Sequence, residues 1–263
     1  MANGLTYVEA AVRRGLDIDL FAPRVAFFFN GHSDFFEEVA KFRAARRLWA
    51  TLLRERFKPK NSRSEILRFH TQTAGSSLTA QQPLNNVVRT TMQALSAVLG
   101  GTQSLHTNGF DEALCLPSQE SALLALRTQQ IIAAESGVVS TVDPLAGSYF
   151  VEHLTDEIEV RVRQQLEVID SLGGVVRAIE QGYPQGEIQR SAYEFQKEVE
   201  SEQRQIVGVN CYQDSTPFEP PESVADSLAE RSQISALREI KNKRSSDAVS
   251  KSTASIKTAA ESG

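Results

Sequence analysis

The fold of this chain is decided by residues 67–116, whose central part, at 68–114, reads RFHTQTAGSSLTAQQPLNNVVRTTMQALSAVLGGTQSLHTNGFDEAL. Amides, hydroxyls and two histidines crowd around the short apolar runs of this stretch. Polar side chains follow one another at 70–73, and five of the six residues at 103–108 are polar, with Leu105 between them. A strand end that only has to pack does not need such clusters, so the pattern indicates residues of a binding site.

Short apolar runs alternate with helical patterns through roughly the first 115 residues, which is typical of βα units. The runs predict strands at 24–29, 66–69 and 103–106, and the helical patterns predict helices at 7–14, 33–53 and 83–99, with Ser33 as an N-cap. About 40 residues separate consecutive strands, which is long enough for a crossover helix and favours parallel pairing. Both polar clusters then fall at the carboxyl ends of strands, the edge where parallel sheets and barrels bind ligands.

The second half of the chain is predicted to be helical. Patterns of helical period cover 121–134, 148–172, 175–181 and 187–205, and residues 207–212 are predicted as a last short strand. The composition then changes to a proline-rich linker, STPFEPPES at 215–223, followed by a polar helical pattern. The sequence therefore predicts two regions, 1–213 and 214–263, the second being a linker and tail.

The composition is typical of a soluble globular protein. The chain has 263 residues, of which 41% are hydrophobic, and a formal net charge of -5 at pH 7, enough chain for one large core or two smaller ones. Its negative net charge gives no general attraction to phosphate backbones, so nucleic acid is not an expected partner. The first residues lack a signal-peptide pattern and no apolar segment approaches spanning length, so we expect a cytoplasmic protein without a membrane partner.

The two cysteines, Cys115 and Cys211, are far apart in the sequence. They form no CxxC pair and have no histidine nearby at metal-ligand spacing, so no metal site is predicted. We interpret them as buried thiols in a reducing compartment.

The amides and histidines of the central stretch admit two interpretations. His70 and His106 could act as general bases, ligands or hydrogen-bond donors, or they could be structural residues of their strands. Gln72, Gln103 and Asn108 suit the recognition of amides and carbonyls without charge, or they could satisfy backbone groups at strand ends. No nearby residue completes a nucleophilic triad, so no catalytic residue is assigned.

Charged residues near the first strand also have ordinary and functional interpretations. Arg24 directly precedes the apolar run VAFFF, where a guanidinium can bind phosphate or carboxylate, or can pair with Asp17 or Asp19. Asp111 and Glu112 are interpreted as the start of a short helix. Five charged residues of the helix after the first strand are interpreted as a solvated face without a chemical role: Glu37, Glu38, Arg43, Arg46 and Arg47.

Seven segments together strongly resemble the adenosylcobalamin-dependent acyl-CoA mutases. They are NGLTYVEAAVRRGLDID (3–19), FAPRVAFFF (21–29), FFEEVAKFRAARRLWA (35–50), RFHTQTAGSSLTAQQP (68–83), NNVVRT (85–90), GGTQSLHTNGFDEAL (100–114) and VDPLAGSYFVE (142–152). The family includes the large subunits of methylmalonyl-CoA, isobutyryl-CoA and 2-hydroxyisobutyryl-CoA mutase. The resemblance covers about residues 3–213.

The resemblance implies a TIM barrel, of which this chain would supply about the last three strands and the helical region that follows. It also implies a substrate acyl-CoA along the barrel axis, adenosylcobalamin on the carboxyl-terminal face and a radical carbon-skeleton isomerisation. The expected partners are a complementary barrel half and a cobalamin-binding subunit, because this sequence contains neither, and the isolated chain is expected to be inactive. Three strands would leave two unpaired edges and an uncovered apolar interior.

The family resemblance also implies roles for particular residues. Arg24, Val25 and Ala26 match positions that contact the acyl-CoA, with Ala26 in place of the usual serine, and His70 and Gln103 match positions that face the substrate channel. Gln72, Asn108 and Glu112 match positions that lie against the corrin. The alternative function is a noncatalytic scaffold or truncated pseudoenzyme that binds mutase subunits.

Overall fold

The computed structural model describes residues 1–214 and 227–262. They belong to two compact units, residues 1–220 and 221–263, and each unit is described by itself. The proline-rich linker predicted at 215–223 lies outside the described residues.

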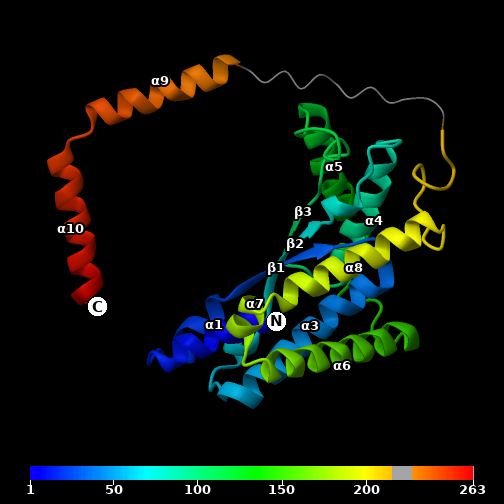
Figure 1. The fold of residues 1–263 in the computed structure, drawn as a ribbon, viewed down its shortest axis with the longest axis horizontal. Helices are drawn as coiled ribbons and strands as arrows, with labels where there is room; N and C mark the ends of the chain where they lie inside the picture. Colours follow the sequence, from blue (N-terminus) through cyan, green and yellow to red (C-terminus); the bar gives the residue numbers. More distant parts are fainter. Residues whose placement is uncertain (215–226, 263) are drawn as a thin grey trace. The chain divides into compact units, whose positions relative to one another are not determined.

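A parallel sheet of three strands, β1 (Ala26–Gly31), β2 (Arg68–Thr73) and β3 (Ser104–His106), forms the centre of the first unit (Figure 1). The strands lie in the order β1-β2-β3. Two helices cross between them: α3 (Phe35–Phe57) connects β1 to β2, and α4 (Asn85–Leu99) connects β2 to β3. The three predicted strands and their parallel pairing are therefore confirmed.

The strand boundaries differ from the prediction in a way that matters for the site. β2 was predicted at 66–69 but extends through the polar residues to Thr73, because backbone pairing with β1 and β3 does not require apolar side chains. β1 begins two residues later than predicted, since residues 22–24 form a 3₁₀ turn. Ser33 is not the N-cap of α3; Asp34 is, and its carboxylate accepts a hydrogen bond from Glu37 N.

One face of the sheet packs against α3 and forms the hydrophobic core. Phe27 meets Trp49 edge-on with ring centroids 4.8 Å apart, and Phe42 stacks on Phe69 at 5.2 Å. Phe42 and Trp49 are almost wholly buried. Burying side chains of this size stabilises the fold by roughly 1.5–3 kcal/mol each.

The opposite face of the sheet carries the alternate residues of each strand and is half-buried or exposed. It consists of Ala26, Phe28 and Asn30 of β1, Arg68, His70 and Gln72 of β2, and Ser104 and His106 of β3. The expectation of an uncovered apolar interior was wrong, because Phe28 is the only large apolar side chain among these residues. We call this set of residues the open face.

The remaining helices of the first unit are α1 (Ala2–Arg13), α2 (Ile18–Phe21), α5 (Gln119–Glu135), α6 (Tyr149–Ser171), α7 (Val175–Glu180) and α8 (Tyr183–Glu200). They confirm the predicted helical region, and α6 lies against α3 (Figure 1). The predicted strand at 207–212 was wrong: the segment forms only an isolated bridge between Val207 and Cys211. Both cysteines are free and half-buried, where burial was expected.

The second unit consists, in its described part, of α9 (Ser227–Lys243) and α10 (Ser246–Ser262). Residues 228–262 are exposed throughout, which matches the predicted polar helical tail. Among residues 1–214 and 227–262 there is no helix with the length and apolarity needed to cross a membrane.

Candidate functional site

The carboxyl ends of β2 and β3 bring together three of the side chains predicted to contact a cofactor. Thr73, the last residue of β2, donates its hydroxyl to Asn108 Oδ1 at 3.0 Å and accepts from Asn108 N at 3.0 Å. Gln72 Nε2 donates to the same Asn108 oxygen at 3.4 Å. Glu112 is exposed beside them. We call Gln72, Thr73, Gly75, Asn108 and Glu112 the amide platform.

Gly75 allows the two loops of the amide platform to approach closely. A Cβ placed on Gly75 would lie 2.9 Å from Asn108 Nδ2 and 3.3 Å from Glu112 Oε1. Asn108 is 2% exposed, and its Nδ2 has no hydrogen-bond partner among the described residues. A buried donor without a partner costs roughly 1–3 kcal/mol, which makes Asn108 Nδ2 a candidate contact for a ligand.

Asp111 shapes the loop that carries Glu112. Its buried carboxylate accepts a hydrogen bond from Ser118 N at 2.9 Å. Burial raises the pKa of Asp111, but hydrogen bonds from Ser118 and Ser121 outweigh it and hold the pKa below its ordinary value. The prediction that Asp111 and Glu112 start a short helix was wrong. The next helix, α5, begins later, with Ser118 as its N-cap, and Glu112 does not cap it.

The two residues predicted to face the substrate channel, His70 and Gln103, have different surroundings. His70 lies on the open face, where its Nδ1 is 2.7 Å from Ser104 Oγ and its ring is 5.0 Å from that of Phe28. Gln103 instead binds the main chain: its Oε1 accepts from Phe69 N at 2.7 Å and its Nε2 donates to Gly101 O. The structure therefore does not bring Gln103 together with His70, and its role toward substrate stays a prediction.

The predicted acyl-CoA contacts lie at the other end of the sheet. Arg24 and Val25 precede β1, and Ala26 begins it. Four residues at ~3.3 Å each place Ala26 about 13 Å along the strand from Asn30, which pairs with Gln72. The structure thus separates the two sets of predicted ligand contacts along the length of the sheet.

Arg24 is exposed and forms no ion pair among the described residues. The proposed pairing with Asp17 or Asp19 was wrong. Asp17 caps α2 by accepting from Asp19 N, and Asp19 accepts from Ser64 Oγ at 2.7 Å and from two backbone amides. Both carboxylates have hydrogen-bond donors nearer to them in the fold, which leaves the Arg24 guanidinium available.

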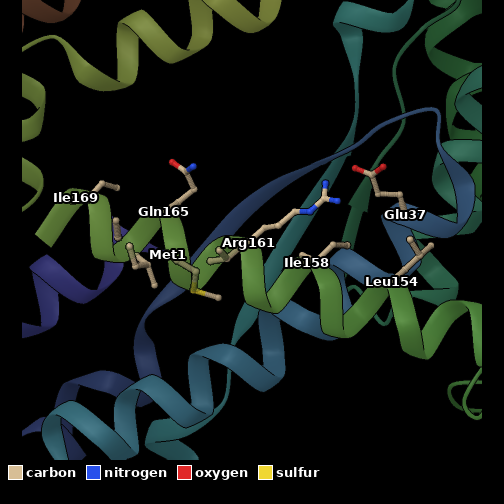
Figure 2. Close-up of a pocket in the computed structure, with 10 residues that line it drawn as sticks. Met1, Glu37, Leu154, Ile158, Arg161, Gln165 and Ile169 are labelled. Carbon is tan, nitrogen blue, oxygen red and sulfur yellow. The ribbon is translucent and has the colours of Figure 1, made fainter. Parts of the chain in front are cut away.

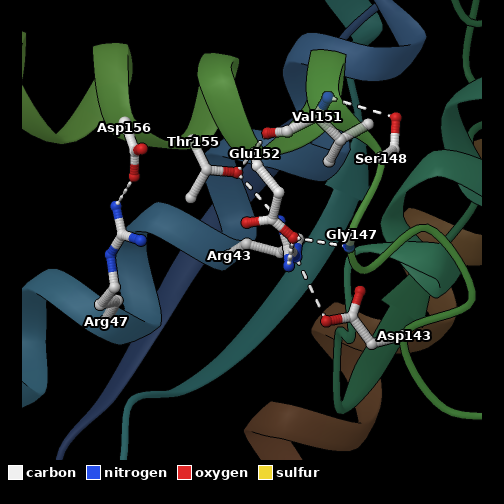
Figure 3. Close-up of polar contacts among 9 residues, drawn as sticks. All are labelled: Arg43, Arg47, Asp143, Gly147, Ser148, Val151, Glu152, Thr155 and Asp156. Carbon is white, nitrogen blue, oxygen red and sulfur yellow. Dashed lines mark hydrogen bonds and ion pairs between the residues drawn. The ribbon is translucent and has the colours of Figure 1, made fainter.

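The charged face predicted for α3 is partly buried in an ionic cluster (Figure 3). Arg43 donates to Glu152 Oε1 at 2.7 Å, to Asp143 Oδ2 at 3.2 Å and to Thr155 Oγ1 at 3.2 Å. The hydrogen bond from Arg43, with one from Gly147 N, lowers the pKa of Glu152 to about 2. The expectation of a solvated face holds for Glu37 and Arg47, which are exposed, but it was wrong for Arg43, because α6 covers this side of α3. We call Arg43, Asp143, Glu152 and Thr155 the ionic joint.

An apolar pocket of about 420 Å³ lies along α6, away from the amide platform (Figure 2). Its lining includes Met1, Leu154, Ile158 and Leu166. The lining is mostly aliphatic but also includes Glu37, Arg161 and Gln165, and none of the predicted site residues belongs to it. No group of three or more His, Cys, Asp or Glu side chains within 1–214 and 227–262 is placed to hold a metal ion.

Several residues of the site were not assigned a role from the sequence. Thr73 was placed after its strand rather than in it, and Gly75 was assigned no role. The motif NNVVRT was noted for resemblance alone, although its Asn86 is completely buried. A buried amide on an amphipathic helix is the signal that could have identified it.

Comparisons with known proteins agree over the whole chain. The methylmalonyl-CoA mutase family model matches residues 1–262. The chain is 53% identical over 212 residues to the 2-hydroxyisobutanoyl-CoA mutase large subunit of Aquincola tertiaricarbonis, covering 81% of this chain and 38% of that protein. It is 45% identical over 249 residues to methylmalonyl-CoA mutase, mitochondrial, of Bos taurus, covering 93% of this chain and 33% of that protein. It is 43% identical over 264 residues to methylmalonyl-CoA mutase, mitochondrial, of Homo sapiens, covering 100% of this chain and 35% of that protein. The chain therefore spans 33–38% of the length of these relatives.

Proposed function

This chain belongs to the methylmalonyl-CoA mutase family, and we propose that it supplies the carboxyl-terminal part of the catalytic barrel of a cobalamin-dependent acyl-CoA mutase. The reaction would be the radical carbon-skeleton isomerisation of a branched acyl-CoA. The observation that carries this proposal is the amide platform, which joins Gln72, Asn108 and Glu112 at one edge of a parallel sheet. The two free cysteines are compatible with the reducing, cytoplasmic location that belongs to the same proposal.

The sheet supports a partner that completes a barrel. Each described strand is parallel to its neighbour, and the outer edges of β1 and β3 pair with no described strand. Unpaired strand edges are usually covered or closed, and barrel closure removes them altogether. The open face would then line the barrel interior. Its polar side chains suit a passage for a ligand better than a packed barrel core, which is dominated by branched apolar residues.

The amide platform fits a corrin, whose rim carries amide groups. Asn108 Nδ2 is a buried donor without a partner, and Gln72 adds a second amide next to it. Side-chain amides both donate and accept, so they pair well with other amides, while the Glu112 carboxylate accepts. When bound, adenosylcobalamin would supply the radical chemistry of the reaction. The residues of this chain would orient the cofactor and help to exclude water.

The open face fits the substrate. Arg24, exposed and unpaired among the described residues, would attract a phosphate group of the coenzyme at the amino-terminal end of the sheet. His70, held by Ser104 at 2.7 Å, would face the acyl group nearer the amide platform. Ala26 offers no hydroxyl, so a hydrogen bond from this position is not available.

Co-expression with a candidate barrel half and a cobalamin-binding subunit, followed by an acyl-CoA isomerisation assay with added adenosylcobalamin, tests the proposal. In the assembly, we expect Asn108→Ala and Glu112→Ala to weaken adenosylcobalamin binding about tenfold and acyl-CoA binding by less than about twofold. Glu135→Ala, an exposed carboxylate at the far end of α5, serves as control and should change neither affinity. Equal losses for both ligands would contradict the assignments, and a monomer that isomerises acyl-CoA unaided would contradict the need for a partner.

A further inference from the structure

We propose that Asn86 and Gln93 are positioning residues, which hold the loops of the amide platform against α4 at the spacing that cobalamin binding requires. This inference rests on the proposed function. Neither residue belongs to the platform. Both are almost wholly buried, Asn86 at 0% and Gln93 at 1% exposure, so neither can touch a ligand directly.

The two amides lie on the same side of α4 because seven residues make nearly two turns of a helix. A buried amide without partners is costly, so the bonds that each amide makes explain why it is there. The two residues bind different loops. Asn86 lies in the first turn of α4 and faces the loops after β2 and β3, whereas Gln93 is near the middle of the helix and faces the loops after β1 and β2.

Asn86 connects the loop after β2 to the loop after β3. Its Nδ2 donates to Thr79 O at 2.9 Å and to Phe110 O at 2.8 Å. Its Oδ1 accepts from Thr79 N at 3.1 Å and from Arg89 Nη1 at 2.8 Å, so all four hydrogen-bonding positions of the amide are used. Phe110 is two residues from both Asn108 and Glu112. Asn86 therefore holds the middle of the segment that carries both of these side chains.

Gln93 connects the loop after β1 to the loop after β2. Its Oε1 accepts from Ala74 N at 3.1 Å, and its Nε2 donates to Ser77 Oγ at 2.6 Å and Ser33 Oγ at 3.3 Å. Ala74 and Ser77 flank Gly75. Because Gly75 leaves only 2.9 Å between a would-be Cβ and Asn108 Nδ2, small shifts of either loop change the shape of the amide platform.

The variant Asn86→Asp tests this role with little change in size. The oxygen that replaces Nδ2 would face the carbonyl oxygens of Thr79 and Phe110, which repel it. The other oxygen keeps the hydrogen bonds that Oδ1 accepts from Thr79 N and Arg89 Nη1. Gln93→Glu is the milder partner variant, because the hydroxyls of Ser33 and Ser77 can turn to donate to a carboxylate. Asn85→Asp is the matched control: the neighbouring amide donates only to Gln82 Oε1.

Hydrogen exchange and ligand affinity in the co-expressed assembly give the readouts. We expect Asn86→Asp to speed amide exchange at 108–112 while strand amides stay protected, to weaken adenosylcobalamin binding about tenfold, and to change acyl-CoA binding by less than about twofold. Gln93→Glu should show the same pattern more weakly, and it carries the test if Asn86→Asp does not assemble. Asn85→Asp should match the wild type.

Two results would overturn the positioning role: unchanged adenosylcobalamin affinity in both variants, or equal losses for both ligands, as a general folding defect would produce. A wild-type assembly that does not bind adenosylcobalamin is a different outcome. It would overturn the proposed function itself, whereas a wild type that binds and variants that bind equally well would overturn only the positioning role.

Discussion

The two faces of the sheet are built from alternate residues of the same three strands, yet they have opposite surroundings. Phe27, Phe29 and Phe69 pack into the core against α3, whereas Phe28 and His70, one residue away, lie on the open face. Successive side chains of a strand point to opposite sides of a sheet. The comparison teaches that stability and ligand binding are assigned to different faces, so substitutions should separate the two properties.

The largest effect is expected from truncating one phenylalanine on each side of the sheet: Phe42 of α3, which packs on the core face, and Phe28 of β1, on the open face. Phe42→Ala removes a fully buried ring from between Phe29 and Phe69, which should destabilise the fold by about 3–5 kcal/mol. Phe28→Ala, at a side chain that is 61% exposed, should change stability by about 0.5 kcal/mol or less. Urea unfolding followed by the fluorescence of Trp49, the only tryptophan, measures both. Similar losses for the two variants would break the comparison.

A smaller effect is expected from Gly75→Ala at the edge of the open face. The added Cβ would meet Asn108 Nδ2 at 2.9 Å, which forces the buried asparagine to shift. Such overpacking costs about 1–3 kcal/mol, and here it should also reduce adenosylcobalamin affinity in the assembly. Gly186→Ala, where no atom lies within 4 Å of the new Cβ, is the control for unfolding and binding measurements. An unchanged cobalamin affinity would mean that the platform tolerates displacement of Asn108.

The smallest effect is expected in the ionic joint, on the side of α3 that α6 covers, and it concerns the dependence of stability on pH. Because the pKa of Glu152 is lowered from 4.5 to about 2, its contribution to stability is present above pH 4.5 and is lost as the pH falls toward 2. Glu152→Gln should therefore flatten the dependence of Tm on pH in this window. Glu135→Gln, an exposed residue without an ion pair among those described, should leave the profile unchanged. The buried amides of α4 do not titrate, so Asn86 and Gln93 variants should not alter it.

The strands and most helices could be predicted because apolar runs and helical periods are local signals. The extent of β2 could not be predicted, because the polar run at 70–73 looks like a loop in the sequence. It is a strand because β1 and β3 supply its backbone partners. Arg43 was misjudged for a related reason. Arg46 and Arg47 follow it within about one turn of α3 and favour a solvated face in the sequence, and only α6, more than 100 residues later, covers Arg43.

The site was predicted in part for a different reason. Gln72, Asn108 and Glu112 were identified through family resemblance, and the structure places them side by side. Nothing local in the sequence indicates that Gly75 belongs to the same platform. Its place there follows from the close approach of two loops, because Gly75 and Asn108 are 33 residues apart in the sequence. The roles of these residues toward cobalamin stay predictions.

The sequence by itself determined the alternation of strands and helices, the parallel sheet and the family, because these depend on periodicity and on motifs written along the chain. Only the tertiary structure decided which polar groups are buried and what they bind. Hydrogen bonds such as those of Asn86 to Phe110 and of Arg43 to Glu152 join residues distant in the sequence. Their partners are set by how the helices pack on the sheet, and no local pattern records that packing.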